Sequence, residues 1–209
     1  MYYSPYMDLD ARSSSRRERN KAAIREKLLD AARTTFVDRG YPATTHDEIA
    51  EAADVARTTA FNYFPHKEDF VVAILADRRA AIRSTMTRLL DEPGSVADAL
   101  HEAMHAFATW FEAEPMLVRA LSRATLQSGV LLRPDFYETS DLFGAAVAAG
   151  QERGEIRPDI DPVAVGRLLI DGYLGIVYRW AAEEDAPSPR QDFVRMVDVV
   201  LDGIRTNPA

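Results

Sequence analysis

The apolar residues of this chain recur three or four positions apart over long segments, and no segment alternates apolar and polar residues as a β-strand does. The first segment with this helical spacing is ended by Gly40 and Pro42, two residue types that stop helices. Its inward positions are Ile24, Leu28, Ala31, Ala32 and Phe36. The pattern therefore predicts an all-α protein.

Two short helices are predicted next. Thr45 and Glu48 have the spacing of a capping box, in which the two side chains accept hydrogen bonds from main-chain N–H groups at the start of a helix. A turn at Asp54 leads into a third helix, expected from about Arg57 to Phe64 and ended by Pro65. We expect five apolar residues to pack inward and hold the two helices at a steep angle: Ile49, Ala50, Val55, Ala60 and Phe64.

The remainder of the chain is predicted to form a C-terminal bundle of six further helices, which makes about nine in all. These helices are expected near residues 67–90, 95–111, 116–126, 134–153, 162–182 and 190–205. The expected organisation is a flexible basic arm over residues 1–19, a helix-turn-helix domain over 20–66, and a ligand-binding and dimerisation domain over 67–209.

The charge of the chain is unevenly distributed. The net charge is −8, yet residues 12–45 contain nine basic and four acidic residues, whereas 14 arginines face 21 acidic residues after residue 70. A basic N-terminal end on an acidic body fits a small surface for DNA phosphates. The chain has no cysteine, which excludes disulfides and thiol chemistry. With no long apolar run and no apolar signal core, we expect a cytoplasmic protein without a membrane partner.

The predicted helix-turn-helix leaves polar and aromatic side chains exposed on one edge of its second helix. A helix edge of this kind suits a DNA groove better than it suits solvent. A hairpin that merely packs within the protein is the structural alternative. The residues expected on the edge are Arg57, Thr58, Thr59, Phe61, Asn62 and Tyr63.

The segment around this motif resembles the TetR family of regulators, with the detailed match over roughly residues 22–75. The helix before it, with Gly40-Tyr41 at its end, is also similar to the family's first helix. The family pattern is carried by Thr45, Ile49-Ala50, Ala53, Val55, Thr59, Phe61, Tyr63-Phe64 and Lys67-Glu68. The departures are Asp54 in place of the usual turn glycine, Ala56 where serine is frequent, and Phe61 where tyrosine is frequent.

The resemblance implies a role for each matching position. Thr45, at a helix N-terminus, would donate to a DNA phosphate, and Lys67 and Tyr63 would also contact phosphates. Phe61 would make apolar contacts with sugar or a thymine methyl, and Thr59 would share the interface. Base edges would be read by Arg57, Thr58 and Asn62. Whether arginines of the arm enter a minor groove is left open, the alternative being a solubilising tail.

A competing motif is the sequence His101-Glu102-Ala103-Met104-His105, a literal H-E-x-x-H. On a helix it places two imidazoles one turn apart, as in zinc hydrolases. A third ligand would have to come from a distant carboxylate such as Asp135 or Glu138. The other interpretations are a role for the histidines in an effector pocket and an ordinary solvent-exposed pair.

Together these features predict a DNA-binding transcriptional regulator, not an enzyme and without a cofactor, that is released from a palindromic operator by an apolar or aromatic effector. The alternative is a helical ligand carrier that binds no DNA. The expected homodimer forms through the last two helices, with Leu169, Tyr173, Val197, Val200, Leu201 and Ile204 as contact candidates. The expected ligand pocket is lined by Met104, Phe107, Phe111, Phe143, Tyr173 and Trp180.

Overall fold

The computed structural model describes residues 6–91, 94–132 and 138–206, which fold into nine α-helices and one short 3₁₀ helix. The prediction of an all-α protein is confirmed, because these residues form no sheet and contain one isolated β-bridge, between Ile156 and Arg205. The helices are α1 (Tyr6–Arg39), α2 (His46–Ala52), α3 (Arg57–Tyr63), α4 (Lys67–Asp91), α5 (Val96–Ala113), α6 (Pro115–Ser128), η1 (Val130–Leu132), α7 (Glu138–Glu152), α8 (Pro162–Ala182) and α9 (Arg190–Ile204).

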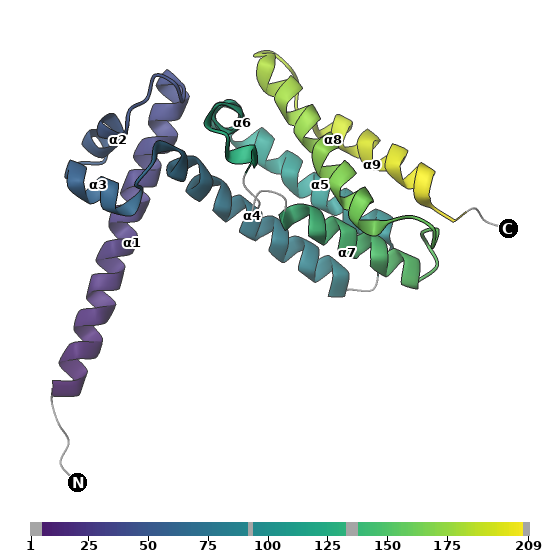
Figure 1. The fold of residues 1–209 in the computed structure, drawn as a ribbon, viewed down its shortest axis with the longest axis horizontal. Coiled ribbons are helices and arrows are strands. Elements are labelled where there is room, and N and C mark those ends of the chain that lie inside the picture. The colour runs from purple at the N-terminus through teal and green to yellow at the C-terminus, as the bar shows by residue number, and fades with distance from the viewer. Residues whose placement is uncertain (1–5, 92–93, 133–137, 207–209) are drawn as a thin grey trace, which may run out of the picture.

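The helices form a small head and a larger body, joined by α4 (Figure 1). The head consists of α2, α3 and the C-terminal part of α1. The body contains α5 to α9 with most of α4, and its core is continuous with that of the head. Helix α1 also contacts α6 of the body, so that the head is attached through two helices. None of the described helices is long and apolar enough to span a bilayer.

The start of the chain differs from the prediction of a flexible arm over residues 1–19. Helix α1 begins at Tyr6, so residues 6–19 extend the first helix and are not an irregular arm (Figure 1). Residues 1–5 lie outside the described part. This extension was not predicted because a serine- and arginine-rich segment lacks an apolar stripe, whereas polar residues can still continue an existing helix.

Local signals place most helix ends near the predicted positions. The capping box at Thr45 and Glu48 is formed in full, and Ser95 and Asp161 cap α5 and α8 with their side chains. Asp54 has φ 53°, the left-handed conformation that the missing turn glycine would favour, and aspartate tolerates it better than most residues. Ala56 provides no side-chain cap for α3, as its chemistry requires.

Helices α7 and α8 approach each other closely at two glycines. A Cβ atom on Gly166 would lie 2.3 Å from the carbonyl oxygen of Ser140 and 2.7 Å from the nitrogen of Gly144. Both of these atoms belong to the backbone of α7, which cannot move as a side chain can. The absence of a side chain at Gly166 is therefore what allows the two helices to touch.

Candidate DNA interface and effector cavity

The helix-turn-helix is held together by the apolar residues predicted for it. Ile49, Ala50, Ala60 and Phe64 are buried. Val55 is partly buried and packs against the same core. The Thr45 hydroxyl accepts a hydrogen bond from the Glu48 N–H at 3.3 Å, and the Glu48 carboxylate accepts one from the Thr45 N–H at 2.8 Å. The Thr45 N–H and the Thr45 hydroxyl, which donates to the same carboxylate at 2.9 Å, lower the pKa of the Glu48 carboxyl. Packing and cap together fix α2 against α3.

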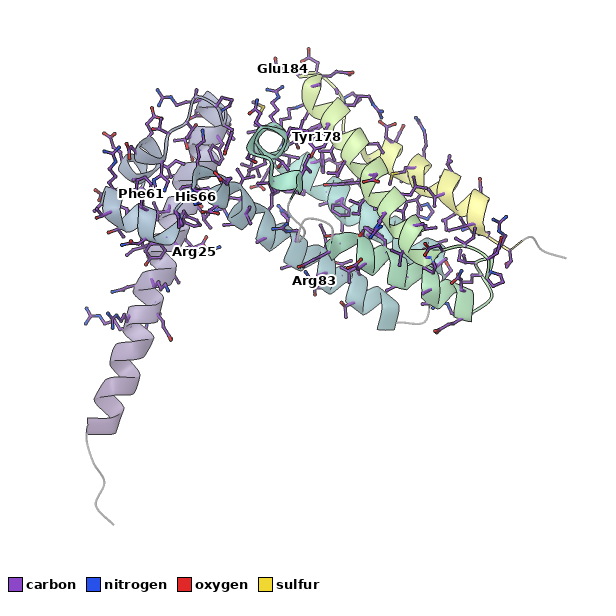
Figure 2. All side chains as sticks on the ribbon, viewed as in Figure 1. Arg25, Phe61, His66, Arg83, Tyr178 and Glu184 are labelled. Carbon is purple, nitrogen blue, oxygen red and sulfur yellow. The ribbon has the colours of Figure 1, made fainter. Side chains whose placement is uncertain are left out.

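The outer edge of α3 is open to solvent. Arg57, Thr58, Phe61 and Asn62 are exposed, and Thr59 and Tyr63 are half-buried. Figure 2 shows Phe61 on the side of the head that faces away from the body. All six edge residues predicted from the sequence therefore lie on one short helix that a partner can reach.

Arg57 forms an ion pair with Asp47 of α2. The Arg57 side chain is nevertheless 68% exposed. Because a solvent-exposed ion pair contributes at most about 1 kcal/mol, this pairing leaves the guanidinium available to a stronger acceptor. No local pattern in the sequence indicates this pair, which joins residues ten positions apart across the turn.

Phe61 is stacked on the imidazole of His46, with ring centroids 3.9 Å apart and an angle of 12° between the rings. Nε2 of His46 lies 2.6 Å from the carbonyl oxygen of Phe64, a hydrogen bond that ties the start of α2 to the end of α3. His46 was missed by the sequence analysis. Its only signal was its position directly after the N-cap, next to the expected interface.

The two predicted phosphate contacts at the base of the head, Thr45 and Lys67, already have protein partners. Thr45 is exposed but its hydroxyl takes part in the cap. The Lys67 ammonium donates to the carbonyl oxygens of Tyr41, at 2.7 Å, and Thr44, at 2.8 Å, and lies over the Tyr41 ring. Partial burial lowers the pKa of the Lys67 ammonium. Since an ammonium has three donors, one of them is left for a further acceptor.

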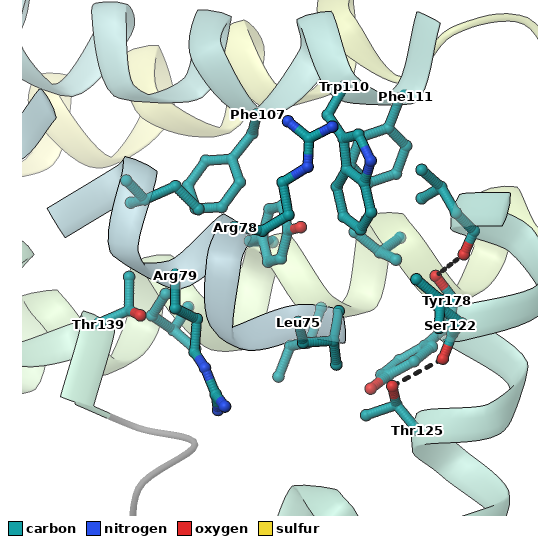
Figure 3. Close-up of a pocket in the computed structure, with 17 residues that line it drawn as sticks. Leu75, Arg78, Arg79, Phe107, Trp110, Phe111, Ser122, Thr125, Thr139 and Tyr178 are labelled. Atoms are coloured by element: carbon teal, nitrogen blue, oxygen red, sulfur yellow. Dashed lines mark hydrogen bonds between the residues drawn. The ribbon is translucent and has the colours of Figure 1, made fainter. Parts of the chain in front are cut away.

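The body contains a cavity of about 750 Å³, mouth included, between α4, α5, α6, α7 and α8 (Figure 3). Phe107, Phe111 and Tyr173 line it, as predicted, and burial raises the pKa of the Tyr173 hydroxyl. The residues of the wall that sequence analysis missed include Leu75, Arg78, Arg79, Ile82, Trp110, Thr139 and Tyr178.

The other three predicted pocket residues do not line this cavity. Met104, Phe143 and Trp180 are buried, and all three belong to the hydrophobic core. Trp180 packs edge-on against Phe111 at a centroid distance of 5.0 Å. An aromatic stripe marks the inside of a helix, but it does not distinguish a cavity wall from a filled core, and that is why the prediction was partly wrong.

The H-E-x-x-H residues of α5 are engaged in surface contacts with other helices. His101 Nε2 lies 2.9 Å from an Asp198 carboxylate oxygen, Glu102 pairs with Arg88, and His105 contacts Arg190. Among the described residues no group of three or more His, Cys, Asp or Glu could hold a metal ion. Glu138 pairs with Arg83, and Asp135 lies outside the described residues. No described feature supports the zinc interpretation.

Most of the residues predicted for a dimer seam face the protomer's own interior. Leu169, Val197, Leu201 and Ile204 are buried, Val200 is half-buried, and Tyr173 lines the cavity. The large apolar residues that are exposed on α8 and α9 are Val163, Leu168 and Val199, and Val199 is 73% exposed. The predicted contact residues were therefore mostly wrong, because helical spacing alone does not show which of two apolar faces is covered.

The comparison with known proteins agrees with the head geometry. Residues 28–74 match the model of the bacterial regulatory proteins of the tetR family. That segment covers the C-terminal part of α1, the whole helix-turn-helix and the beginning of α4. The fold and the exposed recognition edge are those of a helix-turn-helix regulator, and the head of the chain is similar to the TetR family of transcriptional regulators.

Similarity to individual relatives extends into the body. The repressor KstR2 of Rhodococcus jostii is 28% identical over 194 residues, which cover 88% of this chain and 92% of that protein. The A-factor receptor protein of Streptomyces griseus is 27% identical over 150 residues, 71% of this chain, and the aligned part is about half of that relative's length, 52%. The structure of the repressor FadR of Thermus thermophilus, solved with lauroyl-CoA, has a TM-score of 0.72 and 29% identity, with 88% of this chain and 97% of that chain covered.

Proposed function

We propose that this chain represses transcription by occupying operator DNA and leaves the operator when a small molecule fills the cavity. The observation that carries the proposal is the open edge of α3, where Arg57, Thr58 and Asn62 are exposed on a helix that buried residues hold in place. The working division is residues 20–66 for DNA binding and 67–209 for ligand binding and dimerisation. Such a regulator would act in the cytoplasm.

On DNA, α3 would enter the major groove, which is wide enough for a helix. Arg57 suits guanine, Asn62 suits adenine, and the methyl group of Thr58 suits thymine. Phe61 would cover a sugar or a thymine methyl, with Thr59 beside it. Thr45, Tyr63 and the third donor of Lys67 would contact phosphates, which set position and orientation.

A two-fold dimer would place two α3 helices in successive major grooves of a near-palindromic operator. The outer faces of α8 and α9 are the proposed seam, because Leu168 and Val199 are large apolar residues left exposed there. The proposed seam therefore uses the same two helices as the sequence prediction, but with these exposed residues in place of the buried ones.

Release would follow from the way the head is attached to the body. Helix α4 starts at Lys67, beneath the head, and its middle turns line the cavity. Helix α6, another wall of the cavity, contacts α1. A ligand that moved either helix would shift the head and lower operator affinity. That the Thermus FadR structure holds lauroyl-CoA supports a small molecule as the effector class.

The test is fluorescence anisotropy with labelled duplexes taken from beside the gene. Asn62→Ala is expected to relax preference at one base position by about 1–3 kcal/mol, and Lys67→Ala to weaken all sequences alike and reduce the salt slope by about one. Lys67 also donates hydrogen bonds to two carbonyl groups, so the melting temperature of the Lys67→Ala variant is measured in parallel. Arg153→Ala, which removes a cation from the body, is the control for DNA binding. Wild-type protein that binds no duplex sequence-specifically would favour a ligand carrier instead.

A further inference from the structure

Two neighbouring arginines of α4, Arg78 and Arg79, lie in the otherwise mostly apolar wall of the cavity. Arg78 has its charge matched within the protein. One of its guanidinium nitrogens lies 3.2 Å from a Glu114 carboxylate oxygen, and the guanidinium lies 4.7 Å from the centre of the Trp110 ring. Trp110 donates to the same carboxylate at 2.9 Å. These contacts account for Arg78 without a ligand.

Arg79 has no such match among the described residues. Its one hydrogen bond runs to the carbonyl oxygen of Val72 at 3.5 Å, at the limit of a hydrogen bond. No described carboxylate lies within ion-pair distance of it. Glu138, at the start of α7, is taken by Arg83 at 2.8 Å. The guanidinium of Arg79 thus keeps most of its five donors unused at the cavity.

We propose that the cavity binds an amphipathic carboxylate, with the carboxylate on Arg79 and an apolar body in the interior; this deepens the effector role proposed above and rests on it. A guanidinium binds a carboxylate through two parallel hydrogen bonds, which are stronger than bonds between neutral groups. Thr139 lines the same side of the cavity as Arg79 and adds a hydroxyl at this end (Figure 3).

The aromatic wall of the cavity selects the body of the ligand. Phe107 and Tyr173 contact each other there with centroids 4.5 Å apart, and Phe111 and Trp110 continue the aromatic wall. Such a surface accepts a phenyl ring or an alkyl chain, and the charge of Arg78 beside it is matched by Glu114. The cavity therefore combines an aromatic wall with the guanidinium of Arg79, which is the arrangement an amphipathic anion requires. A neutral apolar ligand, with Arg79 extended into water, is the competing occupant.

The experiment is isothermal titration of the full-length chain, without DNA, with two matched pairs of probes: 4-phenylbutanoate against 4-phenylbutan-1-ol, and decanoate against decan-1-ol. Each pair differs in the headgroup alone. The variants are Arg79→Gln and the control Arg83→Gln, which removes a cation one turn further along the same helix, where it pairs with Glu138. Melting temperatures establish that both variants are folded.

We expect each acid to bind wild type at least about tenfold more tightly than its alcohol, as a charge-assisted hydrogen bond predicts. Arg79→Gln should abolish the preference for the acid and leave the affinity for the alcohol within about twofold of the wild-type value. Arg83→Gln should keep the preference for the acid. Three outcomes would overturn the inference. The wild type could bind acid and alcohol with equal affinity, the Arg79→Gln variant could bind an acid as tightly as the wild type does, or neither acid could bind. Since DNA is absent, failed operator binding in the anisotropy test would sink the repressor proposal and leave this result standing.

Discussion

The Phe61 ring lies flat on the imidazole of His46, so the most exposed aromatic residue of α3 is supported from α2. Phe61 keeps 43% of its surface exposed in this position. One face of the ring is used to hold the two helices together, and the remainder is offered outward. This arrangement explains how an aromatic residue can stand on the recognition edge without collapsing onto the core.

The first prediction concerns this stack. Phe61→Ala should lower operator affinity at every sequence that places sugar or thymine methyl against it, while costing only about 1 kcal/mol of folding stability, the usual worth of an aromatic pair. Anisotropy and thermal unfolding measure the two effects. Phe61→Tyr keeps the ring and serves as the control. Unchanged operator affinity in Phe61→Ala would show that the ring has a structural role alone.

The second prediction concerns Arg119, a buried arginine of α6. Its guanidinium donates to the carbonyl oxygens of Trp180, Glu183 and Ala186, beyond or at the end of α8, and lies 3.8 Å from the centre of the Trp180 ring. Arg119→Met removes the guanidinium from these three carbonyls, of which those of Trp180 and Glu183 still accept main-chain N–H groups, and we expect a loss of about 1–3 kcal/mol in the free energy of unfolding. Denaturant titration measures it.

Lysine is the informative comparison at this position. Arg119→Lys keeps the charge but replaces a planar fork with a point donor, and we expect it to recover less than half of the loss. Full recovery by lysine would mean that charge, and not the fork geometry, stabilises the end of α8.

The third prediction concerns the contact of α7 with α8. Gly166→Ala should destabilise the fold by roughly 2–3 kcal/mol, since the added methyl would meet the backbone of Ser140 and Gly144. Gly175→Ala, on the same helix, meets nothing within 4 Å and should be neutral or stabilising by up to about 1 kcal/mol. Thermal unfolding distinguishes the two. If both substitutions changed the stability similarly, helix propensity and not close packing would determine the effect of alanine at these positions.

The head could be predicted from the sequence in detail because its signals are local. The capping box at Thr45 and Glu48, the turn at Asp54 and the stop at Pro65 each involve a few consecutive residues, and the structure contains the helix ends they imply. The stack of His46 with Phe61 and the pair of Arg57 with Asp47 join α2 to α3 across the turn. Their geometry depends on the crossing of the two helices, which no local pattern specifies.

The cavity could be predicted only in part for the same reason. Phe107, Phe111 and Tyr173 were found from apolar spacing, but Arg78 and Arg79 lie on α4 and reach the cavity only because α4 packs against α5 and α7. A charged residue in a helical pattern is ordinarily assigned to solvent. The sequence therefore indicates the apolar residues of a site more readily than a cation, such as Arg79, that has no carboxylate partner among the described residues.

The fourth prediction concerns the pH dependence of the contact between α5 and α9. Hydrogen bonds from Arg190 and from Ser188 lower the pKa of the Glu112 carboxyl from 4.5 to about 2. Because the folded-state pKa is the lower one, this stabilisation is complete above pH 4.5 and is lost as the pH falls toward 2. Arg190 also contacts the His105 ring, at 2.6 Å from Nδ1, so it remains held when the carboxylate is removed.

Glu112→Gln should therefore melt below wild type at pH 6, and the difference in melting temperature should shrink steadily between pH 5 and pH 3. Glu152→Gln, at an exposed glutamate near the end of α7, is the matched control and should follow wild type throughout. Differential scanning calorimetry over this range measures both. A difference in melting temperature that stays constant with pH would mean that Glu112 stabilises the fold through packing or neutral hydrogen bonds. The stabilisation by an ionised carboxylate paired with Arg190 would instead be lost when that carboxylate is protonated.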